Sequence, residues 1–231
     1  MLLENPSKKQ IKEISAQIAP KLITHPVFMF YCKNSDNRQK FIEDYFNYYL
    51  QKWSKTELIF TNDSRDVIVT LVDINNYHTK NKGIAASKLK KYKNPYANVS
   101  YHQGNVAYLS EIVAPANINT KIMTVYATLK YSAEIKKIVD EAIKIAQEQN
   151  FMIVYETFSK KSIDLMTKKG FSVAYEKQFS TTQYFETVMT YYKHDWSEPA
   201  KLIKEFKPIV IDKEPEETDK NDNNNDAEYQ E

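Results

Sequence analysis

Residues 154–171 read Val154-Tyr-Glu-Thr-Phe-Ser-Lys-Lys-Ser-Ile-Asp-Leu-Met-Thr-Lys-Lys-Gly-Phe171, and this stretch decides the fold class. Its first residues complete an apolar run from Phe151 that is typical of a buried strand. Residues 160–169 then predict a short helix, which Gly170 ends because glycine readily adopts the left-handed conformation that often follows a helix. The pattern therefore predicts a strand, a turn, a helix and a further strand from Phe171.

A long amphipathic helix precedes this stretch and is the clearest helix in the sequence. Ser132 is its predicted N-cap, and apolar residues then recur at helical spacing up to Asn150. These residues are Ile135, Ile138, Val139, Ala142, Ile143 and Ala146. Residues 120–129, before the helix, have strand-like composition. A strand, a helix and a strand in this order predict a parallel pair joined by a crossover helix.

The N-terminal quarter predicts two helices. Ser7 and Gln10 form a possible capping box for a first helix that runs to about Leu22. Aromatic and apolar residues at helical spacing predict a second helix over 41–53. Residues 76–103 are polar and rich in Lys, Tyr and Asn, and we expect loops with one short helix there.

The remaining β-rich runs predict a sheet that is mainly antiparallel. Residues 62–65 read as a hairpin turn between two of these runs. The predicted strands are 57–61, 66–73, 105–113, 171–175 and 184–192. Together with the crossover they give an α+β fold, in which helices flank a mixed, mostly antiparallel central sheet.

The C-terminal residues 212–231 differ in charge from the rest of the chain. They hold nine acidic residues against two lysines, a net charge of −7, so the formal charge of +2 leaves +9 on residues 1–211. Because this segment has almost no apolar residue whose burial could offset the entropy of ordering, we expect a disordered acidic tail. The sequence thus predicts one folded domain, 1–211, and a tail, 212–231. The basic domain suits an anionic partner, or serves solubility alone.

Cysteine usage and hydropathy bound the compartment. Cys32 is the single cysteine, so no internal disulfide can form, and the N-terminus lacks the basic start and apolar run of a signal peptide. No run approaches the roughly 18 apolar residues that a membrane helix requires. We therefore expect a cytoplasmic protein without membrane contact.

Two other kinds of site are disfavoured by the residue spacing. The four histidines are scattered, and none lies at metal-ligand spacing from another histidine or from Cys32. Lysines and tyrosines alternate over 88–101, which could be a nucleic-acid surface or a solvated basic loop with its tyrosines folded back. No recognised binding motif accompanies that charge, so a nucleic-acid partner is not expected.

The stretch quoted above resembles the closing motif of the GNAT (Gcn5-related N-acetyltransferase) superfamily. Glu156, Thr157, Gly170 and Phe171 match the family pattern, and the order of elements agrees over residues 7–195. The resemblance implies that acetyl-CoA lies where two parallel strands splay apart, with its pyrophosphate on backbone N–H groups at the start of the long helix. Exposed N–H groups and the helix dipole make such a terminus an anion site.

The resemblance places the pyrophosphate site at Lys130-Tyr-Ser-Ala-Glu-Ile-Lys-Lys137, where the family's glycines are missing. The chain has three glycines, Gly83, Gly104 and Gly170, and none can restore the loop. Glu134 would also put a carboxylate near the phosphates. The predicted cofactor-binding residues are Lys130, Ser132, Ala133, Lys136 and Lys137.

The catalytic residues depart from the family as well. Leu165 and Met166 stand where many members have Phe-Tyr, and a methionine cannot protonate a departing thiolate. The predicted general base is Glu111, because an acid in the apolar run 108–113 would have its pKa pushed toward working pH. The alternative is that Glu111 lies on the solvent face of its strand.

Two functions follow from the resemblance. The first is an acyl-CoA-dependent N-acyltransferase that passes an acetyl group from acetyl-CoA to a small-molecule or protein amine by direct attack. The second is a GNAT-fold binding or regulatory protein without catalysis, which the missing glycines and Met166 favour. The retained overall pattern favours the enzyme, and this is an argument from the fold.

Overall fold

The computed structural model describes residues 1–77, 88–128, 130, 132–178 and 185–192. Its centre is a six-stranded sheet with the strand order β1-β2-β3-β4-β6-β5. The strands are β1 (Leu58–Thr61), β2 (Ile68–Asp73), β3 (Thr120–Tyr126), β4 (Met152–Thr157), β5 (Ser172–Gln178) and β6 (Phe185–Tyr191). β3 and β4 are parallel, whereas the other neighbouring pairs are antiparallel. The predicted mixed, mostly antiparallel sheet is confirmed.

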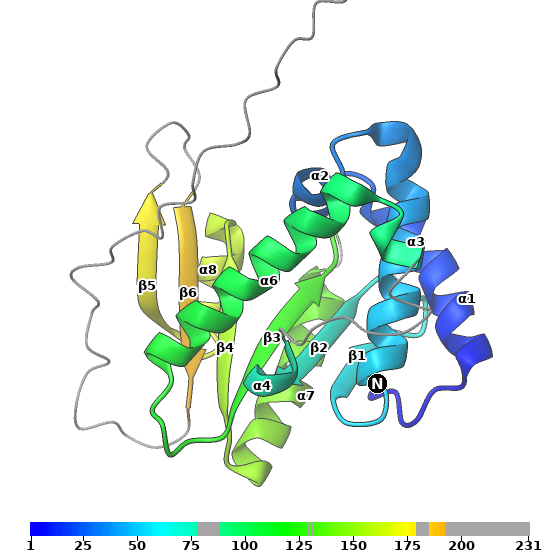
Figure 1. The fold of residues 1–231 in the computed structure, drawn as a ribbon. Coiled ribbons are helices and arrows are strands. Elements are labelled where there is room, and N and C mark those ends of the chain that lie inside the picture. The colour runs from blue at the N-terminus through cyan, green and yellow to red at the C-terminus, as the bar shows by residue number, and fades with distance from the viewer. Residues whose placement is uncertain (78–87, 129, 131, 179–184, 193–231) are drawn as a thin grey trace, which may run out of the picture.

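Helices cover both faces of this sheet (Figure 1). On one face lie α1 (Lys8–Ile18), the 3-10 helix η1 (Ala19–Leu22), α2 (Pro26–Tyr31), α3 (Ser35–Trp53), α4 (Ile74–Tyr77) and α6 (Lys93–Val113). On the other lie α7 (Ser132–Gln149) and α8 (Lys160–Thr167). α7 is the predicted crossover between the parallel strands. The acidic tail predicted at 212–231 lies outside the described residues.

The N-terminal helices begin at side-chain caps. Ser7 Oγ accepts a hydrogen bond from the Gln10 amide, and Gln10 Oε1 accepts one from the Ser7 amide, so the predicted capping box is confirmed. α3 begins after Asn34, whose side chain accepts from two amides of the first turn. Between them α2 buries Phe28, whose ring packs against aromatic rings of α3 and of β3. This aromatic layer holds the N-terminal helices on the sheet.

The prediction of a strand at 105–113 is wrong, because these residues form the second half of α6. The buried side chains of α6 recur at helical spacing and are Val99, Gln103, Val106, Ala107, Leu109 and Ser110. Two of them are polar, and Ser110 satisfies its hydroxyl by donating to the Val106 carbonyl at 2.6 Å. Because the buried face mixes polar and apolar residues, its helical period is hidden. α6 also replaces the loop predicted for the end of 76–103.

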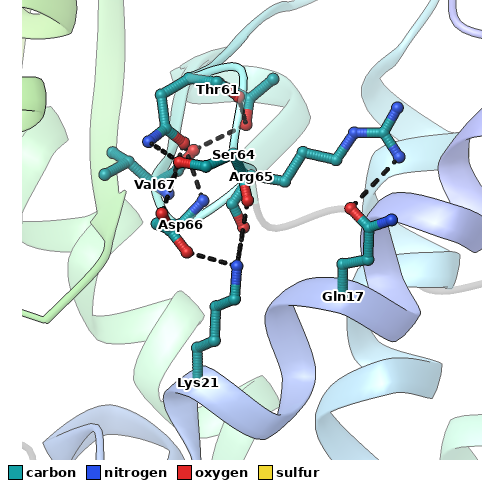
Figure 2. A network of polar contacts seen from close by, with 8 residues as sticks. Gln17, Lys21, Thr61, Ser64, Arg65, Asp66 and Val67 are labelled. Carbon is teal, nitrogen blue, oxygen red and sulfur yellow. Dashed lines mark hydrogen bonds and ion pairs between the residues drawn. The ribbon is translucent and has the colours of Figure 1, made fainter.

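The hairpin predicted around 62–65 joins β1 to β2, and polar contacts fix it to the N-terminal helices (Figure 2). Asn62 Oδ1 accepts from the amides of Asp66 and Val67 at 2.7 and 3.1 Å, which closes the turn. Lys21 of η1 pairs with the Asp66 carboxylate and donates to the Ser64 carbonyl. The strand edge is therefore anchored to the helical layer.

The end of α8 agrees with the prediction from glycine. Gly170 has φ of +91°, and the Phe171 amide donates to the Met166 carbonyl at 3.1 Å to close the helix. Met166 itself is buried in the core on the α7 face. α8 thus returns the chain to the sheet for β5.

Candidate functional site

The parallel strands β3 and β4 separate partway along their length. Their pairing runs from Thr120 opposite Met152 to Met123 opposite Tyr155. Beyond that point, among the described residues, β3 pairs with β2 as far as Tyr126, and β4 pairs with β6 as far as Thr157. The facing backbone groups of the two strands therefore do not pair with each other in this gap.

The N-terminus of α7 follows the end of β3, and the predicted cofactor-binding residues gather there. Lys130 and the side chains at 132, 133, 136 and 137 are all exposed, and they belong to the connection and the first turns of the helix. Glu134 lies in the first turn and is half-buried. Cofactor binding by these residues stays a prediction.

A buried polar chain lies at the opening of the gap, on the face that α6 covers. Glu156 is the first residue of β4 beyond the parallel pairing. Its Oε2 lies 2.8 Å from His102 Nε2 of α6, and His102 Nδ1 lies 2.6 Å from the hydroxyl of Tyr31 of α2. The side chains of His102 and Glu156 are 13% and 8% exposed. Three elements that are distant in sequence thus meet at one point.

A second carboxyl group, Glu186 of β6, belongs to the same cluster. Burial is the main cause that raises the pKa of Glu186 to about 8, and repulsion by Glu156 and a hydrogen bond to it add to the rise. Burial alone would lower the pKa of His102, but the ion pair with Glu156 and the nearby Glu186 outweigh burial and raise it. The shift favours the charged imidazole, in which both ring nitrogens donate, one to Glu156 and one to Tyr31.

We predict that imidazole NMR will give His102 a pKa above the ordinary 6.5, and that Glu156→Gln will lower it because burial then dominates. His25 is the internal control, because burial lowers its pKa to about 4 and it stays neutral from pH 6 upward. The His102–Glu156 ion pair contributes its full stabilisation below pH about 6.5, and this stabilisation is lost as the pH rises through the raised pKa of His102. A His102 pKa below 6.5 in the unsubstituted protein would contradict the ion pair.

Solved structures share this arrangement of the chain. The C-terminal condensation domain of Ebony, solved with beta-alanyl-dopamine, matches with a TM-score of 0.53, 11% identity, and coverage of 84% of this chain and 98% of that one. The polyamine N-acetyltransferase of Drosophila melanogaster matches with a TM-score of 0.48 and 7% identity, over 84% of this chain and 99% of that one. A putative acetyltransferase of Acinetobacter baylyi matches with a TM-score of 0.47 and 14% identity, over 86% of this chain and 96% of that one.

The chain has a GNAT-like fold, as the resemblance of residues 154–171 implied. The splayed parallel pair within an otherwise antiparallel sheet, with a helix crossing between the two strands, carries this conclusion together with the Ebony match. No protein-family model matches the sequence, and no curated protein matches it in a sequence search. At 11% identity the likeness establishes the fold and nothing finer.

Within the GNAT fold, the predicted base Glu111 lies away from the splay. It is exposed on α6, where it lines an open surface pocket of about 330 Å³ with Ile74, Asn75, Gly104, Ala107 and Tyr108. Glu111 lies nine positions after His102 on the same helix, roughly 13–14 Å along the axis. The apolar strand on which its pKa argument depended is absent from this part of the chain. Glu156 and His102 meet at the splay instead.

Sequence reasoning recognised Glu156 as part of a motif but missed its partners. His102 and Tyr31 lie 54 and 71 residues from their respective contacts, Glu156 and His102, so no spacing rule connects them. The signal available was helical: His102 falls beside the buried positions Val99 and Val106 of α6. A correct prediction of α6 as a helix would have placed His102 near the buried face of that helix.

Other site classes find no support in the described residues. No group of three or more His, Cys, Asp or Glu there could hold a metal ion. The Lys/Tyr-rich region is folded back in part, because Lys91 and the Tyr92 hydroxyl both contact Asp44 at about 3 Å. No helix in the described part of the chain is long and apolar enough to cross a membrane.

Proposed function

We propose that this protein is an acyl-CoA-dependent N-acyltransferase that transfers an acetyl group to an amine by direct attack. One observation carries the proposal: a buried carboxylate and imidazole meet where β3 and β4 separate. Such a pair is suited to remove a proton from an amine, and the open strand edges are suited to hold an extended acyl donor. The fold alone would not distinguish an enzyme from a binding protein.

The start of α7 fits the phosphate end of an acyl-CoA. Its first-turn N–H groups have no partner within the helix, and Lys130, Lys136 and Lys137 add positive charge around them. Glu134 opposes an anion in the same turn, so we expect weaker binding than at a glycine-rich loop. Bound acetyl-CoA would supply the thioester whose carbonyl carbon the amine attacks.

Glu156 is the proposed proton acceptor. The acceptor's ammonium group would donate to the free oxygen of Glu156 and pass one proton there, after which the amine nitrogen forms the C–N bond. The C–S bond then breaks, and the second proton from the nitrogen passes to the departing CoA thiolate. His102 is a positioning residue, because its charged ring fixes one oxygen of Glu156 and Tyr31 fixes the ring. Together they hold the carboxylate facing the splay.

The second candidate is a GNAT-fold binding protein without catalysis. Met166 favours it, because this side chain is 1% exposed within the α7-side core and offers no proton to a leaving thiolate. The two candidates differ in one measurable step, the consumption of the thioester.

Titration of the purified chain with acetyl-CoA, by calorimetry and by thermal shift, tests the proposal. We expect saturable binding that weakens at least tenfold in the charge-reversed variant Lys136→Glu/Lys137→Glu, followed by thiol release with one or more amines from a panel. Binding without thiol release would support the non-catalytic candidate. Failure to bind millimolar acetyl-CoA would rule out the acyltransferase.

A further inference from the structure

Glu186 lies in a charged environment that the proposed chemistry leaves unexplained. It is on the same face of the sheet as Glu156, on the neighbouring strand, and its charge interacts with that of His102 of α6. Across the β5–β6 register stands Lys177, and Tyr175 of β5 is close enough for its pKa to be raised by Glu186 after the larger effect of burial. Tyr31 of α2, held to His102, completes the surroundings.

The carboxyl pair lacks donors. Glu156 Oε2 accepts a hydrogen bond from the His102 imidazole. Glu156 Oε1 is fully buried and accepts no hydrogen bond from an amide, a hydroxyl or a charged nitrogen in the described part of the chain. Glu186 lies two residues from Val188, the partner of Glu156 in the β4–β6 register, so the two carboxyl groups are neighbours on one face, and the raised pKa of Glu186 favours its protonated form. A buried, unpaired carboxylate oxygen is costly, so that proton is a substitute for a missing donor.

The charge balance leaves room for one positive group. The protonated imidazole of His102 neutralises Glu156, and Lys177 attracts Glu186 too weakly to overcome burial and the repulsion from Glu156. One bound cation would let Glu186 ionise and would supply donors to both carboxyl groups. A dication would bring a second charge into a cluster that has no further carboxylate among its named members.

The surroundings are also aromatic. The rings of Phe30, Tyr31 and Phe158 lie 6.4, 5.5 and 6.4 Å from the His102 ring, and Phe30 is 47% exposed. An exposed aromatic ring beside a charged site favours a ligand whose ammonium group is attached to an apolar body.

We propose that Glu156 and Glu186 together bind the ammonium group of a monoamine with an aromatic or alkyl body, and that this group takes the place of the proton on Glu186. The proposal rests on the acyltransferase function and names the class of its acceptor. The exchange balances: the ammonium keeps its three hydrogens on binding, the Glu186 carboxyl ionises, and its proton leaves to solvent.

The test is calorimetric titration with 2-phenylethylamine, with and without CoA, in two buffers that differ in ionisation enthalpy. Since the pKa of Glu186 is raised to about 8, we expect close to one proton released per amine at pH 7 and little at pH 9, with affinity about tenfold higher at pH 9. The diamine 1,4-diaminobutane should bind at least tenfold more weakly than 2-phenylethylamine at either pH.

Glu186→Gln is the decisive variant, because glutamine mimics the protonated carboxyl but cannot ionise. This substitution should abolish proton release and lower the affinity for 2-phenylethylamine at least tenfold. Glu176→Gln is the matched control: it removes an exposed carboxyl from β5 on the opposite face, and proton release should be unchanged. Unaltered proton release in Glu186→Gln, tighter binding of the diamine, or no amine binding in the presence of CoA would each overturn the inference.

These outcomes are independent of turnover. Amine binding with proton release but no thiol release would support the amine site and rule out the acyltransferase function. Acylation of amines without proton release at Glu186 would do the reverse.

Discussion

Glu156→Gln is expected to lower kcat for acetyl transfer by about 100- to 10,000-fold, the range typical for loss of a general base. Glutamine can still accept a hydrogen bond from His102 but cannot take a proton, so the geometry is kept while the chemistry is lost. The affinity for acetyl-CoA should change little, because the predicted phosphate site at the start of α7 belongs to another part of the fold. Thiol release under saturating amine and acetyl-CoA measures the effect.

Two further variants give this result its meaning. Glu111→Gln removes the acid that the sequence favoured, and a loss confined to that variant would return the base to α6. Glu176→Gln changes the same charge on an exposed strand position and should keep full activity. Because removing one partner of a buried ion pair can destabilise a protein by several kcal/mol, melting temperatures of all three variants must be compared first.

The second half of the fold was predictable because each of its elements is locally consistent. Ile135 to Ala146 follow one helical face, and Gly170 has the positive φ that a helix terminator requires. The crossover helix between two strands then fixes the parallel pair at the centre of the sheet. The point at which β3 and β4 separate has no local signal in the sequence, and it was expected from the family resemblance alone.

Two helices were missed for opposite reasons. No helix was predicted between Leu22 and residue 41, whereas α2 begins at Pro26, a position where proline's missing N–H costs nothing. In α6 the polar side chains Gln103 and Ser110 are buried, so the apolar period is broken and the run near Glu111 resembles a strand. Both errors concern the elements that bring Tyr31 and His102 to Glu156.

The candidate site could not be assembled from the sequence for that reason. The start of the crossover helix at Ser132 was predicted correctly, because a helix start is a local feature, and cofactor binding there stays a prediction. The polar chain of Tyr31, His102 and Glu156 depends on tertiary packing. Because residues 105–113 of α6 were predicted as a strand, His102 could not be recognised as a neighbour of Glu156. Helix assignment therefore limits site prediction here more than motif recognition does.

The packing of α2 should have the largest effect on stability. Phe28 is fully buried, and its ring lies 5.3 to 5.8 Å from those of Tyr45, Phe46 and Tyr126, so it joins α2 to α3 and to the end of β3. Phe28→Ala should lower the free energy of unfolding by about 3–5 kcal/mol, since it removes the transfer energy of a ring and leaves a cavity among rigid neighbours. Urea denaturation monitored by circular dichroism measures this loss.

Phe30→Ala is the matched control for this experiment. It removes the same side chain from the same helix, but Phe30 is 47% exposed, so we expect a cost below about 1 kcal/mol. Because α2 also carries Tyr31, loosening it by Phe28→Ala should release the hydrogen bond on His102 Nδ1 and change the NMR titration of that imidazole. Equal costs for the two substitutions would mean that α2 is not held on the sheet through Phe28, and the support of His102 from that side would have to come from α6 alone.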